Sequence, residues 1–213
     1  MTAAGADVIL AAFTEQQPLP LDELRAALAE DWDWLVFSSA KAVPALVEAL
    51  AGRPLTAQLA AVGPATAEAL SEAGLTPALV AQPANGAALV TAFPAGPGRI
   101  LIPGAADHSL EPSAGLVAKG WDVHNVAVYR TISLPLPESV VSRWQAGTID
   151  AFIVTAGSVA RAAVQSAGLP GPRVVALGPS AARVATDLGL TVAATATRPL
   201  AAALADAVLA ALS

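Results

Sequence analysis

Two runs of hydroxyl-bearing residues beside expected helix starts are the first residues here that could do chemistry. Ser38-Ser39-Ala40-Lys41 follows an apolar run of strand length and precedes an alanine-rich helical pattern. Thr155-Ala156-Gly157-Ser158 has the same surroundings but lacks the lysine. The unpaired N–H groups and the dipole of a helix N-terminus favour a bound anion, and Lys41 would add positive charge. Alone, the first run is more simply a helix cap beside a surface lysine.

Two Gly-Pro turns form a second pair of candidates. Gly63-Pro64-Ala65-Thr66 and Gly178-Pro179-Ser180 each separate an apolar strand pattern from a helical pattern. Glycine allows close approach of the backbone, and proline suits the first turn of a helix. Thr66 and Ser180 can offer hydroxyl groups there. A single turn of this kind would be explained by capping of the helix. Two equivalent copies indicate that both turns bind the same ligand, one from each side.

Tyr129 is the only tyrosine of the chain. A phenol can donate a proton or a hydrogen bond to a departing hydroxyl group. The alternative is a half-buried tyrosine that only anchors its strand, because strands are rich in aromatic residues. His108, in the loop that follows an apolar run at 99–102, is a weaker candidate donor, and a solvent-exposed loop histidine is the simpler interpretation.

The two hydroxyl-bearing runs and the two Gly-Pro turns belong to an internal repeat. Segment 33–43 parallels 150–159 with an offset of 117 residues, and segment 61–67 parallels 176–182 with an offset of 115. A Gly-Leu pair follows each copy, at Gly74 and Gly189. A repeat of this length is too long for a solenoid and predicts two similar domains.

Strand and helix patterns alternate in both copies. Apolar runs at 34–37, 99–102, 152–154 and 173–177 have strand length, and we expect the second of them to end at Pro103-Gly104. This alternation predicts parallel sheets covered by helices, with ligands at the carboxyl ends of the strands. Proline-containing segments read as extended linkers. The predicted organisation is a continuous domain 20–126, a second domain from 1–10 plus 138–213, and linker strands 11–19 and 127–137.

Composition excludes several classes of function. Hydrophobic residues make up 55% of the 213 residues, charged residues 13%, and the net charge is −6. Without a Lys/Arg cluster and with 4% aromatic residues, nucleic-acid binding is not expected. The lack of cysteine excludes disulfides and thiolate sites, two histidines are too few for a His-rich metal site, and nucleotide-binding and nucleophile-elbow motifs are missing. No segment reads as a leader or a membrane span, so a soluble cytoplasmic protein is expected.

Four segments resemble the uroporphyrinogen-III synthase family in their order and spacing: 33–43, 61–67, 126–131 and 176–182. The resemblance covers nearly the whole chain. It implies an α/β fold of two flavodoxin-like parallel-sheet domains joined by a two-stranded linker, with the active site in the cleft. It also implies a lyase of porphyrin biosynthesis that uses no cofactor and no metal. Its substrate would be hydroxymethylbilane, a linear tetrapyrrole with eight carboxylates, which loses water, inverts ring D and closes into a macrocycle.

The resemblance also assigns residues. Tyr129 matches the family's tyrosine, which assists loss of the hydroxyl group, and is the expected catalytic residue. The expected substrate-binding residues are Ser38, Ser39, Lys41, Gly63, Thr66, Thr155, Ser158, Gly178 and Ser180. A monomer is expected, with hydroxymethylbilane synthase as the candidate partner that hands over the substrate.

Three features depart from the family pattern. The usual first strand and helix, with a Thr-Arg, are not found before the segment Gly5–Ile9, so we expect either that the start is truncated or misassigned or that the domain lacks a strand and an active-site arginine. The loop after Ile102 lacks an arginine that many members carry, and Ala181 stands where a second hydroxyl residue is common. These departures favour an alternative, a non-catalytic module of the same fold that binds a tetrapyrrole or a small anion. A weaker alternative is an unrelated two-lobed sensor of small anions.

Overall fold

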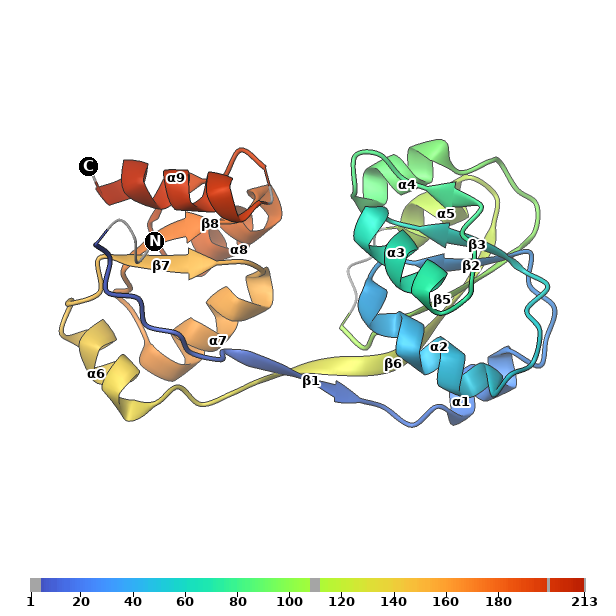
Figure 1. The fold of residues 1–213 in the computed structure, drawn as a ribbon, viewed down its shortest axis with the longest axis horizontal. Coiled ribbons are helices and arrows are strands. Elements are labelled where there is room, and N and C mark those ends of the chain that lie inside the picture. Colours follow the sequence, from blue (N-terminus) through green and yellow to red (C-terminus); the bar gives the residue numbers. More distant parts are fainter. Residues whose placement is uncertain (1–4, 108–111, 199, 213) are drawn as a thin grey trace. The chain divides into compact units, whose positions relative to one another are not determined.

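The computed structural model describes residues 5–107, 112–198 and 200–212, which fall into two compact units (Figure 1). Unit 2 is Gln16–Thr131, and unit 1 contains the described residues before Gln16 and after Thr131. His108 lies outside the described residues. Within those residues, no helix has the length and apolar character needed to cross a membrane.

Unit 2 contains most of a sheet with the strand order β1-β6-β5-β2-β3-β4, in which β1 begins and β6 ends two residues inside unit 1. Every pairing among the last five strands is parallel, which confirms the predicted sheet type. The strands are β1 (Thr14–Pro18), β2 (Trp34–Phe37), β3 (Gln58–Ala61), β4 (Leu79–Val80), β5 (Arg99–Ala105) and β6 (Asp122–Ser133). The helices are α1 (Asp22–Ala27), η2 (Ala40–Ala42), α2 (Val43–Leu50), α3 (Pro64–Glu72), α4 (Gly86–Ala92) and α5 (Ser113–Ala118).

Strand β2 is the centre of the parallel part of this sheet. Its side chains alternate between two cores: Leu35 and Phe37 pack with α1 and α2, whereas Val36 packs with residues of β5 and α4. Burial on both faces explains why the strand is a continuous apolar run. After β4 the chain crosses back past β2 to form β5 on its other side. In doubly wound sheets, ligands bind beyond the carboxyl ends of the strands at such a reversal.

Unit 1 contains a smaller parallel sheet with the order β7-β8-β9. Its strands are β7 (Ala151–Val154), β8 (Arg173–Ala176) and β9 (Val192–Thr195), and its helices are α6 (Glu138–Gln145), α7 (Gly157–Ala167), α8 (Pro179–Asp187) and α9 (Ala201–Leu212). Alanines on α7 and α8 pack closely onto Phe152, Val154 and Val174. Small side chains on these helices let them lie close to so small a sheet.

Strand β5 differs from the prediction. It does not end at Pro103-Gly104 but continues through both residues to Ala105. Both remain in register with β6, opposite Val126 and Ala127. Pairing with β2 extends only to Leu101, so beyond it one side of β5 needs no ladder donor. A proline, which lacks the N–H group, is tolerated in a strand under that condition.

The repeat predicted from the sequence recurs as equivalent hydrogen bonds. The N–H of Ala81 donates to the carbonyl of Ala61 at 3.0 Å, and that of Ala196 donates to the carbonyl of Ala176 at 2.8 Å. Helices α3 and α8 both end in the same motif. In each, a glycine of positive φ, Gly74 or Gly189, is followed by a leucine whose N–H donates to a carbonyl in the last turn of the helix. The N–H of Leu75 donates to the carbonyl of Leu70, and the N–H of Leu190 donates to the carbonyl of Ala185.

Candidate active site

Three predicted segments of unit 2 lie at the carboxyl edge of its sheet. The turn at 38–41 follows β2 and leads into η2, which packs against both β5 and α3. The turn at 63–66 follows β3 and opens α3. At the end of β5, the N–H of Ala106 donates to the carbonyl of Tyr129 at 2.8 Å. The fold therefore brings Tyr129 and both turns to one edge, at the reversal of strand order.

Tyr129 is held by its backbone and ring and not by its hydroxyl group. It is half-buried, and its side chain packs against the core that contains Val126 and Val128. Its hydroxyl makes no hydrogen bond to any described residue. The sequence alone is compatible with either a structural anchor or a proton donor at Tyr129. The ring serves as an anchor, and the hydroxyl remains available to a ligand.

The turn after β2 contains one hydroxyl with a structural task. The Oγ of Ser39 accepts the N–H of Lys41 at 3.3 Å and so caps η2. Ser39 thus fits the capping interpretation. Ser38 and Lys41 are exposed, and neither side chain is bonded to another residue in the described part of the chain. These two side chains are free to meet a ligand at this edge.

Thr66 presents a hydroxyl from an otherwise buried side chain. The residue is only 4% exposed. Its hydroxyl has no hydrogen-bond partner among the described residues. Every fully buried side-chain nitrogen or oxygen of those residues does have a partner. The small exposed area of Thr66 must therefore include its Oγ1. The threonine is fixed by packing, while its hydroxyl opens to solvent at the start of α3.

The four residues predicted in the second copy gather at the carboxyl edge of unit 1. Thr155 follows β7, Ser158 is the second residue of α7, and Gly178 and Ser180 flank the start of α8. The N–H of Leu177 donates to the carbonyl of Val154 at 2.9 Å and holds the two turns together. No side chain caps either helix start. In α7 the N–H of Val159 donates to the carbonyl of Ala156 at 3.1 Å, so the N–H groups of the two residues before it, and that of Ser180 in α8, are the ones left for solvent or an anion.

A third turn, which the sequence does not predict, lies at the same edge of unit 1. It follows β9 and contains Arg198, whose side chain is exposed. The strand before it reads Val-Ala-Ala-Thr, with only one large apolar residue. So weak a pattern does not stand out from a loop. Only the register with β8 reveals it as a strand.

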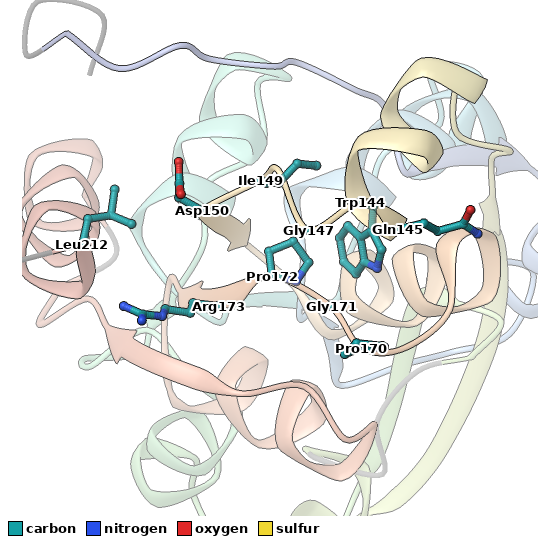
Figure 2. A pocket seen from close by; sticks show the side chains of 10 residues that line it. All are labelled: Trp144, Gln145, Gly147, Ile149, Asp150, Pro170, Gly171, Pro172, Arg173 and Leu212. Atoms are coloured by element: carbon teal, nitrogen blue, oxygen red, sulfur yellow. The ribbon is translucent and has the colours of Figure 1, made fainter.

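A hollow of about 520 Å³ lies at the opposite, amino edge of the unit 1 sheet (Figure 2). Trp144, Gly171 and Pro172 line one part of it, and Asp150 and Arg173 line another. Arg173 already has a structural role, because its Nη1 donates to the carbonyl of Ala211 in the last turn of α9 at 3.2 Å. A cation is favourable at a helix C-terminus. The hollow contains none of the predicted site residues.

The pKa of Arg99 is raised, and this residue also lies away from the candidate site. The Glu30 carboxylate accepts a hydrogen bond from Arg99 at 2.7 Å and holds the pKa of Arg99 above its ordinary value. The guanidinium lies over the ring of Trp32, 4.2 Å from its centre. Arg99 begins β5, so this network stabilises the amino edge of the sheet. The described residues contain no group of three or more His, Cys, Asp or Glu side chains that could hold a metal ion.

Comparisons with known proteins agree on one family. A family model described as uroporphyrinogen-III synthase HemD (HEM4) matches residues 1–206. A mutant uroporphyrinogen III synthase from Thermus thermophilus matches with a TM-score of 0.67 and 20% identity, over 94% of this chain and 87% of that one. Uroporphyrinogen-III synthetase from Helicobacter pylori 26695 matches with a TM-score of 0.67 and 20% identity, over 92% and 90%. At such identities the structures support the fold. No curated protein sequence matches.

Proposed function

The chain belongs to the uroporphyrinogen-III synthase family, and we propose that it cyclises hydroxymethylbilane to uroporphyrinogen III in haem biosynthesis. One observation carries the proposal beyond family membership. Tyr129, with a hydroxyl that no described residue binds, shares the carboxyl edge of the unit 2 sheet with the turns that contain Ser38, Lys41 and Thr66. A proton donor beside groups that bind carboxylates is what this reaction requires.

Loss of the terminal hydroxyl group is the step in which Tyr129 acts. The phenol donates a proton to the hydroxyl group, which leaves as water, and the phenolate regains a proton when the cyclised intermediate loses one. The carbocation left behind is stabilised by the electron-rich pyrrole to which it is attached. Because this departure is chemically easy, the main task of the protein is to hold the chain so that the inverted ring D closes. The hydroxyl and amide groups at the two carboxyl edges serve this positioning.

Binding of eight carboxylates must overcome a net charge of −6 on the protein. Helix N-termini contribute here without adding charged side chains, because their first-turn N–H groups point outward. The starts of α3, α7 and α8 lack a side-chain cap. Gly63 and Gly178 precede two of these starts, and Thr155, Ser158 and Ser180 add hydroxyl groups. We assign these residues to substrate binding.

We further propose that the protein acts as a cytoplasmic monomer and takes its substrate from hydroxymethylbilane synthase. The instability of the substrate, which closes spontaneously to the type I isomer, makes direct hand-over advantageous. Analytical ultracentrifugation of the protein, alone and mixed with that synthase, tests both statements. A stable dimer would overturn the first, and sedimentation unchanged by the synthase would overturn the second.

A coupled assay tests the activity itself. Hydroxymethylbilane is made in place by its synthase, the products are oxidised, and the isomers are separated by chromatography. Type III product above the type I background is expected. Type I product alone would refute the synthase activity. If a tetrapyrrole bound under those conditions, the result would favour the non-catalytic alternative.

A further inference from the structure

The turn that follows β9 lies beside the predicted substrate-binding residues of unit 1. Thr195 is in register with Ala176 of β8, and the N–H of Ala196 donates to the carbonyl of Ala176 at 2.8 Å. Beyond this bond, one chain continues to Gly178 and Ser180 and the other to Arg198. Parallel strands end at the same edge of a sheet. Arg198 therefore stands at the edge where α7 and α8 begin.

Two other arginines of unit 1 have structural tasks. Arg143 forms an ion pair with Asp7 at 3.4 Å, and Arg173 caps α9 at the amino edge. Arg161 and Arg183 lie in the second turns of α7 and α8 and do not directly follow a strand. The side chain of Arg198 is exposed and forms no hydrogen bond or ion pair with a described residue. Its guanidinium is therefore free to meet a ligand.

Comparison of the two copies of the repeat indicates a role for the positive charge of Arg198. In unit 2 the first candidate turn carries Lys41, whereas the equivalent turn of unit 1, Thr155 to Ser158, has no lysine or arginine. Arg198 supplies positive charge to the same edge from a different strand. A guanidinium can also bind a carboxylate through two parallel hydrogen bonds, which fixes orientation as well as charge.

We propose that Arg198 binds a carboxylate of hydroxymethylbilane at the carboxyl edge of unit 1. This inference rests on the proposed function, because that function supplies the polycarboxylate. The chain has only 11 lysine and arginine residues against 17 aspartate and glutamate residues. With so few cations, each free one at the substrate edge contributes noticeably to binding. Arg198 acts in binding and takes no part in proton transfer.

The test compares Arg198→Ala and Arg198→Lys with Arg183→Ala, a control that removes another arginine of the same unit. Steady-state rates of type III formation are measured as hydroxymethylbilane concentration varies, at low and high salt. Arg198→Ala is expected to raise KM roughly three- to tenfold at low salt, the range of an exposed charge-assisted contact. Its kcat should stay close to that of the unchanged protein. Arg198→Lys should recover part of the affinity, and Arg183→Ala should change nothing.

A binding measurement separates failure of this inference from failure of the proposed function. Uroporphyrin III, a stable octacarboxylate, is titrated into each protein and followed by quenching of tryptophan fluorescence. Weaker binding by Arg198→Ala than by Arg183→Ala supports the role of Arg198 even if the unchanged protein makes no type III isomer. Equal KM and equal uroporphyrin affinity in the two variants would overturn it, even if the unchanged protein is an active synthase.

Discussion

Thr66 and Ala181 occupy the same position in the two units, 115 residues apart. Each is the third residue of a helix that begins with Gly-Pro, and each is nearly buried, at 4% and 5% exposure. Only Thr66 brings a hydroxyl to this position. Ser180 of unit 1 stands one residue earlier and is exposed, equivalent to Ala65. The repeat has therefore kept its backbone while the two edges acquired different polar groups.

The buried position of Thr66 makes a clean substitution possible. Thr66→Val preserves the shape of the side chain and removes only the hydroxyl, which has no described hydrogen-bond partner. We expect the melting temperature to stay equal or rise, because no internal hydrogen bond is lost. If the hydroxyl binds a substrate carboxylate, kcat/KM should fall about tenfold or more, since a hydrogen bond to a charged group contributes about 1.5–3 kcal/mol. Calorimetry and the coupled assay measure the two effects, and unchanged kcat/KM would remove Thr66 from the site.

The glycines that precede the two Gly-Pro helices should respond differently to the same change. A Cβ at Gly63 would collide with the Cβ of Ala84, whereas a Cβ at Gly178 would have no atom within 4 Å. Both have extended φ angles that alanine can adopt. Gly63→Ala should therefore destabilise the protein by about 1–3 kcal/mol, the usual cost of overpacking.

Gly178→Ala is the matched partner of that substitution. It should leave the unfolding midpoint in urea nearly unchanged but raise KM several-fold, because a methyl group would stand where the proposed carboxylate approaches the backbone. Equal destabilisation of both variants would contradict the packing difference between the two turns. A Gly178→Ala protein with normal KM would contradict a role for this turn in binding.

Much of the fold could be predicted from the sequence because the repeat contains residues with strong preferences for particular local structures. Asp33 and Asp150 mark the starts of two buried apolar strands, and the Gly-Pro and Gly-Leu pairs mark the start and end of α3 and α8. These signals depend on neighbours in the chain. They therefore predicted parallel strands and the edge at which candidate residues gather.

What the sequence could not predict depends on contacts between distant residues. Pro103 remains in a strand because β2 no longer pairs with β5 at that point. Residues close to Pro103 in the sequence give no sign of where this pairing ends. Ser39 and Ser38 look equivalent in the sequence, and only the bond from the Lys41 N–H identifies Ser39 as the cap. Arg198 cannot be placed from the sequence because β9 has too few large apolar residues to be recognised as a strand.

Arg99 should matter for stability and not for activity. It donates to Glu30 and to the carbonyl of Asp31, and it lies over the ring of Trp32. Arg99→Met should lower the melting temperature by a few degrees and leave KM unchanged. Arg25→Met is the control, because Arg25 makes only two ion pairs with described residues, both at 3.5 Å.

The pH dependence of the Arg99 effect follows from the raised pKa. A group whose pKa is higher in the folded state stabilises the protein below its unfolded pKa and loses this effect only as pH rises through the folded value. For an arginine that window lies in strong alkali. The difference in melting temperature between Arg99→Met and the unchanged protein should therefore persist from neutral pH to mildly alkaline pH. A difference that vanished on mild alkalinisation would show that another group is responsible.

Tyr129→Phe is the decisive substitution for the proposed chemistry. The ring that packs on the core of unit 2 is retained, and the hydroxyl that is removed has no partner among the described residues. Stability should therefore be unchanged. If the phenol assists departure of the hydroxyl group, kcat for the type III isomer should fall by roughly 10², the lower range for general acid catalysis, with little change in KM.

Tyr129→Ala, which also removes the ring, should lower the melting temperature as well, so the pair separates anchoring from catalysis. Full activity of Tyr129→Phe would mean that the hydroxyl leaves unaided and that the protein accelerates closure by positioning alone.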